Sequence, residues 1–270
     1  MALTRVLITV KTYPTLSGKH EESVCTAGIR EDGSWIRIYP VPFRKKPFHE
    51  QYKKFDFIEM DIVKNEGDFR PESFRPALHD TEIRIVEHLG TENDWEQRKR
   101  TCLQNVHIDM EALIESAKNP ENHTSLAVFK PAQILNFSAI ETDREWDRAK
   151  LEKLNQLNLF ERTTRETSEV VQKLPYKFTF TFVDCRGKES TLMIEDWEIG
   201  QLYWNCLAKH RDEQKAIDDV RKKYFDLFTK KKDLYFFLGT TLAYHNRSKN
   251  PFMIIGVFYP PIQRQLSLFD

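Results

Sequence analysis

Near position 180, a strict alternation of aromatic and β-forming residues constrains the fold of this chain more than any other feature. The sequence there reads Phe178-Thr179-Phe180-Thr181-Phe182-Val183. Successive side chains of a strand point to opposite faces, so all three phenylalanines fall on one face. The whole chain contains 19 Phe and only 9 Gly, and this balance favours sheets packed through aromatic side chains.

Similar strand patterns recur through the first part of the chain. They cover residues 5–11, 23–29, 34–39, 55–63 and 83–89. Asp32-Gly33, between the second and third of these segments, is a hairpin turn signal. In the third segment, Trp35 and Arg37 share one face and Ile36 takes the other. Helical patterns follow over residues 94–103 and 109–118, and Pro120 stops the second of them.

The second part of the chain repeats this organisation. Strand patterns cover residues 125–129, 134–140, 178–183, 190–195, 234–240 and 252–259. A long helical region over residues 196–230 separates the fourth of these strands from the fifth. Asp196 is a good N-cap residue for that region, because its carboxylate can accept a hydrogen bond from the first free backbone amides.

Each half of the chain therefore reads as a handful of strands with a helix inserted between them. This organisation is consistent with a small Greek-key barrel such as an OB fold, although periodicity alone also permits other small barrels. We expect an α+β, mostly β protein with two small OB-like Greek-key barrels and helical insertions. The expected divisions are an N-terminal domain over residues 1–122, a C-terminal domain over 123–260 and a tail over 261–270.

Several short phrases of the sequence support the same fold. They are Val24-Cys25-Thr26-Ala27-Gly28-Ile29, Gly33-Ser34-Trp35-Ile36-Arg37, the stretch from Ser125-Leu126 to Lys130-Pro131, and Leu174-Pro175-Tyr176-Lys177-Phe178. They resemble bacterial proteins that have a dual OB-fold domain. The resemblance covers most of the chain and implies nucleic-acid binding, with no catalytic residues to carry over. OB folds also bind sugars and proteins, so the fold alone does not fix the ligand.

Composition limits the classes of function that the chain can serve. The 41 basic and 41 acidic residues give a formal net charge of zero, so any nucleic-acid binding must come from local patches. The sequence has no run of 18 apolar residues, no signal-peptide pattern, no Walker loop, no dinucleotide-binding glycine motif and no zinc-type spacing of Cys or His. We therefore expect a cytoplasmic protein that requires no membrane, cofactor or metal.

A segment of mixed basic and aromatic residues is the best internal candidate for nucleic-acid contact. Single-strand binders combine cations for the phosphates with aromatic faces for the bases. The predicted contact residues, including two on the preceding strand, are Trp35, Arg37, Phe43, Arg44, Lys45, Lys46, Phe48, Tyr52, Lys53 and Lys54. The alternative is a solvated connector whose aromatic residues, and the Trp of the strand, pack into the core.

Asp196 and Glu198 are the candidates for catalysis. Carboxylates gathered at the end of a strand can hold magnesium in nucleases. The same residues also suit the start of the predicted helix, where Asp caps the first turn and Glu is favoured. Capping is the better-supported interpretation, and an enzymatic role stays an alternative hypothesis.

The tail Gln265-Leu266-Ser267-Leu268-Phe269 carries the most specific functional signal. It resembles the Gln-Leu-(Ser or Asp)-Leu-Phe peptide with which bacterial DNA polymerases and repair factors dock on the sliding clamp. A chance match is expected in about one chain in a thousand. Its alternative is an apolar tail that packs on its own domain.

Taken together, these signals predict a DNA-binding accessory protein that is recruited to the sliding clamp. Single-stranded nucleic acid is the favoured ligand, and RNA is possible in place of DNA. Replication, repair and antiviral defence all fit such a role. The alternatives are a clamp-recruited DNA-processing enzyme, such as a nuclease or base-processing enzyme, and a protein-interaction module without nucleic-acid binding.

Overall fold

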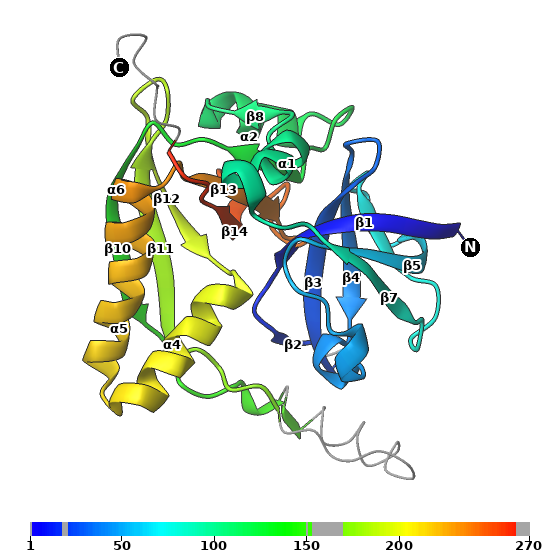
Figure 1. Ribbon diagram of the computed structural model, residues 1–270, viewed down its shortest axis with the longest axis horizontal. Helices are drawn as coiled ribbons and strands as arrows, with labels where there is room; N and C mark the ends of the chain where they lie inside the picture. The colour runs from blue at the N-terminus through cyan, green and yellow to red at the C-terminus, as the bar shows by residue number, and fades with distance from the viewer. Residues whose placement is uncertain (1, 18–20, 150, 153–169, 263–270) are drawn as a thin grey trace.

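The protein is mostly β, with two seven-stranded sheets and a few helices (Figure 1). The computed structural model describes residues 2–17, 21–149, 151–152 and 170–262. The first half comprises β1 (Ala2–Lys11), β2 (Thr15–Ser17), β3 (Glu21–Arg30), β4 (Trp35–Val41), the 3₁₀ turns η1 (Phe43–Lys45) and η2 (Phe48–Glu50), β5 (Asp56–Lys64), β6 (Ser73–Pro76), β7 (Ile83–His88) and α1 (Glu92–Cys102).

The second half is richer in helices. It comprises β8 (Val106–His107), α2 (Met110–Lys118), β9 (Leu126–Phe129), β10 (Gln133–Glu141), β11 (Tyr176–Val183), β12 (Glu189–Ile194), α4 (Trp197–His210), α5 (Glu213–Arg221), the π-helical turn η3 (Lys222–Leu227), α6 (Phe228–Lys231), β13 (Tyr235–Thr240) and β14 (Phe252–Phe258). The predicted α+β, mostly β class is confirmed. No helix in the described ranges is both long enough and apolar enough to cross a bilayer.

Five strands of the first sheet close into a barrel. The pairing runs β1-β3-β4-β6-β5, and β5 pairs back with β1. The β4–β6 pair is parallel, whereas the other four pairs of the ring are antiparallel. Strand β7 extends the sheet at β5.

The second sheet has the same strand order but is open instead of closed. It runs β10-β11-β12-β14-β13-β9-β8, with β12 and β14 parallel. Strands β9 and β10, interrupted by Lys130-Pro131-Ala132, together take the place that β1 alone has in the first sheet. Helices α4–α6 lie between β12 and β13 in the sequence, where the first half has its two 3₁₀ turns. In place of the two small OB-like Greek-key barrels that the sequence predicts, the structure has one closed barrel and one open sheet of matching strand order.

Local sequence signals explain several element boundaries. Gly33 adopts φ 81° in the β3–β4 turn, and Asp32 accepts hydrogen bonds there from the amide and hydroxyl of Ser34. The predicted hairpin is confirmed. Asp196 caps α4, as predicted. The predicted single helical region breaks at Arg211, which has φ 53°, before Asp212 caps α5.

The two sheets change over between β7 and β8, earlier than residue 122. Strand β8 pairs with β9 of the second sheet. Helix α2, which the sequence placed in the N-terminal domain, packs Met110, Leu113 and Ala117 into the core of the second half. The reason is that the apolar face of a helix determines the core in which it packs. The position of the helix relative to a domain boundary predicted from the sequence does not.

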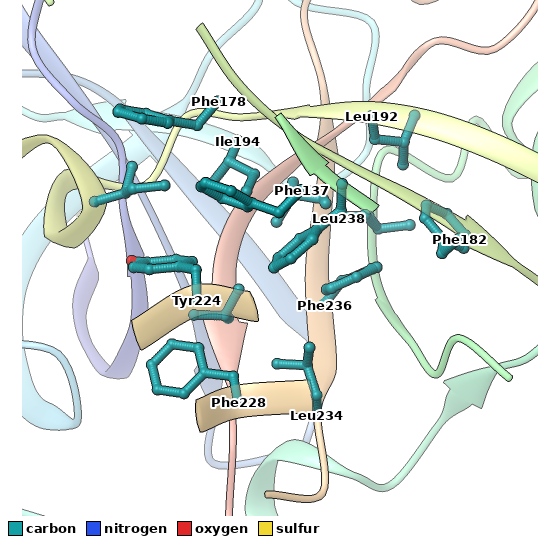
Figure 2. Packing of buried hydrophobic residues seen from close by; sticks show 14 of the residues in the cluster. Phe137, Phe178, Phe182, Leu192, Ile194, Tyr224, Phe228, Leu234, Phe236 and Leu238 are labelled. Atoms are coloured by element: carbon teal, nitrogen blue, oxygen red, sulfur yellow. The ribbon is translucent and has the colours of Figure 1, made fainter. Parts of the chain in front are cut away.

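Aromatic side chains fill the core of the second half (Figure 2). Phe180 and Phe236 are fully buried, and their rings stack with centroids 5.5 Å apart. Tyr224 and Phe228 from the helical insertion cover this layer. The common face of the alternating phenylalanines is thus the core face of β11, as the pattern predicted.

A second set of buried residues joins the two halves. Leu7 and Ile29 of the first half belong to one apolar cluster with Val128, Phe237 and Phe258 of the second. The halves consequently share a continuous core, and side chains from both can meet at the rim of this contact.

Candidate ligand pocket between the two halves

A pocket of about 400 Å³ opens where the two halves meet. Its lining residues come from the end of β1, the segment before β5, the end of β7, α1, the start of α4 and the end of β14. They are Lys11, Lys53, Lys54, Phe55, His88, Trp95, Arg98, Asp196, Trp197, Glu198, Val257 and Tyr259. This volume lies within the range of small-molecule sites.

The backbone is strained at Phe55 and Trp95, which line the pocket, and at the two residues before Trp95. Phe55 has φ 68°, and Asn93, Asp94 and Trp95 have φ values of 49°, 54° and 67°. Bulky residues rarely adopt the left-handed region, and each such residue costs about 1–3 kcal/mol. The rings of Phe55 and Trp95 contact each other, with centroids 6.2 Å apart. Strain of this kind concentrates at binding and catalytic sites, so it marks this pocket as a functional candidate.

Lys54 forms the charged floor of the pocket. Its Nζ lies 3.3 Å from Asp196 Oδ2 and 3.2 Å from Glu198 Oε2, and it donates to the carbonyl oxygen of Val257. Burial raises the pKa of Asp196 to about 6. Burial alone would lower the pKa of Lys54, but the two carboxylates outweigh it and raise that pKa. These contacts join Lys54 of the first half to α4 and β14 of the second half.

Besides the exposed Lys53, two cations that are half-buried or buried line the pocket without a carboxylate partner in the described part of the chain. Lys11 Nζ donates to the carbonyl oxygen of Tyr52 and lies 3.9 Å and 4.5 Å from the ring centroids of Phe43 and Trp197. Burial lowers the pKa of Lys11 to about 8.

Arg98 is the second of these cations, and it is only 6% exposed. It donates to the carbonyl oxygen of Leu89, and its guanidinium lies 4.0 Å from the ring centroid of Phe55. Its Nη2 also lies 3.2 Å from Nε2 of His88, whose Nδ1 lies 2.6 Å from Asp56. With Arg98 donating, His88 is the Nδ1–H tautomer and donates to Asp56. Burial lowers the pKa of Arg98. Buried charges normally have a counter-charge, so this arrangement favours binding of an anion.

Replacing Lys11 by methionine is expected to stabilise the protein by about 1–3 kcal/mol at pH 7. The lysine keeps a proton in a buried site, and its folded pKa of about 8 lies below its ordinary value of 10.5. Between these pH values the unfolded chain binds more protons, so the wild-type protein gains stability as pH rises. Urea denaturation should show that the stability gained by Lys11→Met over the wild type is smaller at pH 9.5 than at pH 7. An advantage that is unchanged by pH would contradict this explanation.

The structure divides the predicted residues of the basic and aromatic segment, Phe43 to Lys54, into three groups. Lys53 and Lys54 line the pocket. Arg44, Lys45 and Phe48 are exposed on the two 3₁₀ turns, and Phe48 is 89% exposed.

The remaining residues of the segment are buried. Phe43 and Tyr52 pack inside the barrel, and Lys46 is paired with Glu50. These three side chains, predicted to contact nucleic acid, are therefore not available for it. The alternative interpretation of the segment, a connector whose aromatic residues pack back onto the barrel, is correct for them.

Trp35 and Arg37, the predicted extension of the platform, lie between the two halves. Trp35 packs edge-on against Phe237, with ring centroids 5.8 Å apart. Arg37 is 3% exposed and donates to the hydroxyl and carbonyl oxygens of Ser125 and to the carbonyl oxygen of Thr240. Their shared strand face is as predicted, but the second half covers it, and Arg37 joins the two halves.

Asp196 and Glu198, the weak catalytic candidates, act first as partners of Lys54. Asp196 is 1% exposed and accepts from the amide of Glu198 as the α4 N-cap. The side chain of Glu198 is 41% exposed. Within the described ranges, no three His, Cys, Asp or Glu side chains are grouped as metal ligands. The tail residues Gln265, Leu266, Ser267, Leu268 and Phe269 lie outside the described residues.

Sequence reasoning missed most of the pocket. Lys11 ends a strand, while Trp95 and Arg98 sit in a charged helix, so none carries a motif. Trp197 lies between Asp196 and Glu198 in the sequence and carries no signal of its own. The available signal was indirect, because tryptophan is scarce and two of the five in the chain line this pocket.

Comparisons with known proteins divide the chain where the two sheets do. Residues 2–104 match a family described as "Domain of unknown function (DUF8758)", and residues 106–270 match "Domain of unknown function (DUF8757)". No curated protein matches the chain. A solved structure described as "Structure of murine DNA binding protein bound with ds DNA" is similar over 98% of each chain, at 8% identity and a TM-score of 0.33.

Proposed function

The chain belongs to the DUF8757 family, whose profile covers its larger part, and we propose that it is a nucleic-acid-binding protein. The ligand is single-stranded DNA or RNA, and one of its nucleotides enters the pocket between the two halves. The observation that carries this proposal is a pair of cations, the half-buried Lys11 and the buried Arg98, that line an aromatic pocket and have no carboxylate partner among the described residues.

The chemistry of the pocket suits a nucleotide better than other anions. Phosphate needs cations, and a base needs aromatic faces on which to stack. The pocket supplies the first through Lys11, Lys53 and Arg98, and the second through Trp95 and Trp197. A simple inorganic anion would make no use of the two indole rings.

The strand connectivity supports an OB assignment for the barrel. In chain order its ring strands run 1-2-3-5-4-1 with strands 3 and 5 parallel, which is the order of an OB barrel. The second sheet repeats this order with its first strand broken. OB barrels bind oligonucleotides on strands 2 and 3, but here the corresponding face, β3 and β4, carries Ile29 and Arg37 against the second half. The pocket at the rim of that contact is the accessible alternative.

Binding of short single-stranded oligonucleotides tests this proposal. We expect fluorescence anisotropy to show binding that weakens as salt increases, because phosphate contacts release counter-ions. The double variant Lys11→Gln/Lys53→Gln should weaken binding at least about tenfold. The matched control Arg100→Gln changes an exposed cation of α1 outside the pocket and should change affinity less than about twofold. Equal losses in both proteins would contradict a role for the pocket.

We also propose that the tail recruits the protein to the bacterial sliding clamp in the cytoplasm, for replication, repair or antiviral defence. The support is the five-residue match at Gln265 to Phe269. Tethering would raise the local concentration of a weak single-strand binder at the DNA without any new contact to it.

Changing the two apolar residues of the tail, Leu268→Ala/Phe269→Ala, should weaken clamp binding about 100-fold or more. Each side chain contributes about 1.5–3 kcal/mol when buried in a groove. Surface plasmon resonance with immobilised clamp measures this effect. The control is Ser267→Asp, which keeps the motif and should keep the affinity. Wild-type protein that does not bind at tens of micromolar would rule out recruitment by the tail, but it would leave the pocket proposal standing.

A further inference from the structure

We infer that the pocket prefers a phosphate monoester, as found at the end of a nucleic-acid strand or on a free nucleotide, to the phosphodiester of an internal position. This inference rests on the proposed function for its ligand class, and it adds which phosphate of that ligand enters the pocket.

The balance of charge in the pocket carries the inference. The lining of the pocket holds four cations, Lys11, Lys53, Lys54 and Arg98. It holds two carboxylates, Asp196 and Glu198, so the pocket has a surplus of positive charge. Lys54 is bonded to both carboxylates and can balance only one of them, so the surplus positive charge resides on Lys11, Lys53 and Arg98. A monoester carries about −1.5 to −2 charge at pH 7, whereas an internal diester carries a single negative charge. The dianion therefore matches the surplus more closely.

The size of the pocket points the same way. About 400 Å³ lies near the lower end of the range for ligand sites. One nucleotide with its phosphate suits such a space, whereas an internal nucleotide must also lead the chain both in and out. Phe55 and Trp95, whose backbones are strained, form the pocket wall beside Arg98. Their rings lie next to its guanidinium, so aromatic surface and positive charge are adjacent.

The ionisation of Lys11 adds a pH signature to the preference. Burial lowers the pKa of its ammonium to about 8, while Glu198, Asp196 and Asp56 oppose this and Lys54 reinforces it. Above pH 8 Lys11 loses its proton, so affinity should fall toward tenfold per pH unit. Below about pH 6 the monoester gains a proton and loses charge. Monoester affinity should therefore be highest between about pH 6 and 8.

The test compares matched 12-residue single strands with a 5′-phosphate, a 3′-phosphate or hydroxyls at both ends, each titrated with the full chain. We expect at least one phosphorylated strand to bind about tenfold or more tightly than the hydroxyl strand. Equal affinity of all three strands overturns the inference but keeps the proposed function. Absence of binding to any strand overturns the proposed function itself.

A free nucleoside monophosphate and one variant complete the test. Binding of the monophosphate as tight as that of the phosphorylated strand identifies the free nucleotide as the source of the phosphate. Lys11→Gln should reduce the tenfold preference to about threefold or less and remove the fall in affinity above pH 8, while Arg100→Gln keeps both. Circular dichroism checks that each variant is folded. A Lys11→Gln protein that keeps the full preference overturns the assignment.

Discussion

Replacing Arg37 by methionine is expected to lower the free energy of unfolding by about 3 kcal/mol or more. The buried guanidinium satisfies the hydroxyl and carbonyl oxygens of Ser125 and the carbonyl oxygen of Thr240. The three acceptors keep other partners in Thr240, Arg70 and Glu72, so the loss is that of the bonds themselves. Hydrogen bonds from a charged donor contribute about 1.5–3 kcal/mol each, and this change removes three of them. Methionine keeps most of the apolar stem, so the loss reports mainly the hydrogen bonds between the two halves.

Urea denaturation followed by tryptophan fluorescence measures the effect of this change. The exposed control Arg100→Met should change stability by less than about 0.5 kcal/mol. Oligonucleotide affinity of the folded Arg37→Met protein should stay within about twofold of wild type. The opposite pattern, with stability kept and affinity lost, would restore the sequence-based assignment of Arg37 to nucleic-acid contact.

Replacing Lys54 by methionine is expected to cost about 3–5 kcal/mol of stability. Its ammonium is the shared partner of Asp196 and Glu198, and its side chain is 10% exposed. Without it, two carboxylates face each other at the contact between the halves, and one of them, Asp196, is almost fully buried. Breaking a buried ion pair from one side leaves an uncompensated charge, which is the costly case.

The neighbouring lysine provides the control for this change. Lys53 is exposed, so Lys53→Met should alter stability by less than about 0.5 kcal/mol. Adding Asp196→Asn to Lys54→Met should recover part of the loss, because the amide oxygen can still cap α4 without a charge. Equal effects of Lys53→Met and Lys54→Met, or no recovery in the double variant, would contradict the ion-pair explanation.

Much of the local structure could be predicted because it depends on neighbouring residues. The alternation at Phe180 identified both a strand and its core face. Asp32 and Gly33 specified the hairpin turn, and Asp196 specified the start of α4. Each signal acts over a few residues of chain, through side-chain direction, left-handed backbone or capping of free amides.

The partners of the charged side chains could not be predicted in the same way. Arg37 bonds to Ser125, 88 residues away, and Lys54 pairs with Asp196, 142 residues away. A run of basic and aromatic residues looks the same in the sequence whether its members face water or a core. Tyr52 and Phe48 belong to one such run, yet the first is 1% exposed and the second 89%.

The sequence by itself determined the mostly β class, the two-part organisation, the hairpin turn and the N-cap of α4, because short-range physical chemistry is sufficient for each. Only the tertiary structure decided that one sheet closes into a barrel while the other stays open. It also decided that Arg37 and Lys54 join the halves, and that Lys11 and Arg98 meet at one pocket. Burial removes water from a charge, and which groups replace that water depends on contacts between distant segments.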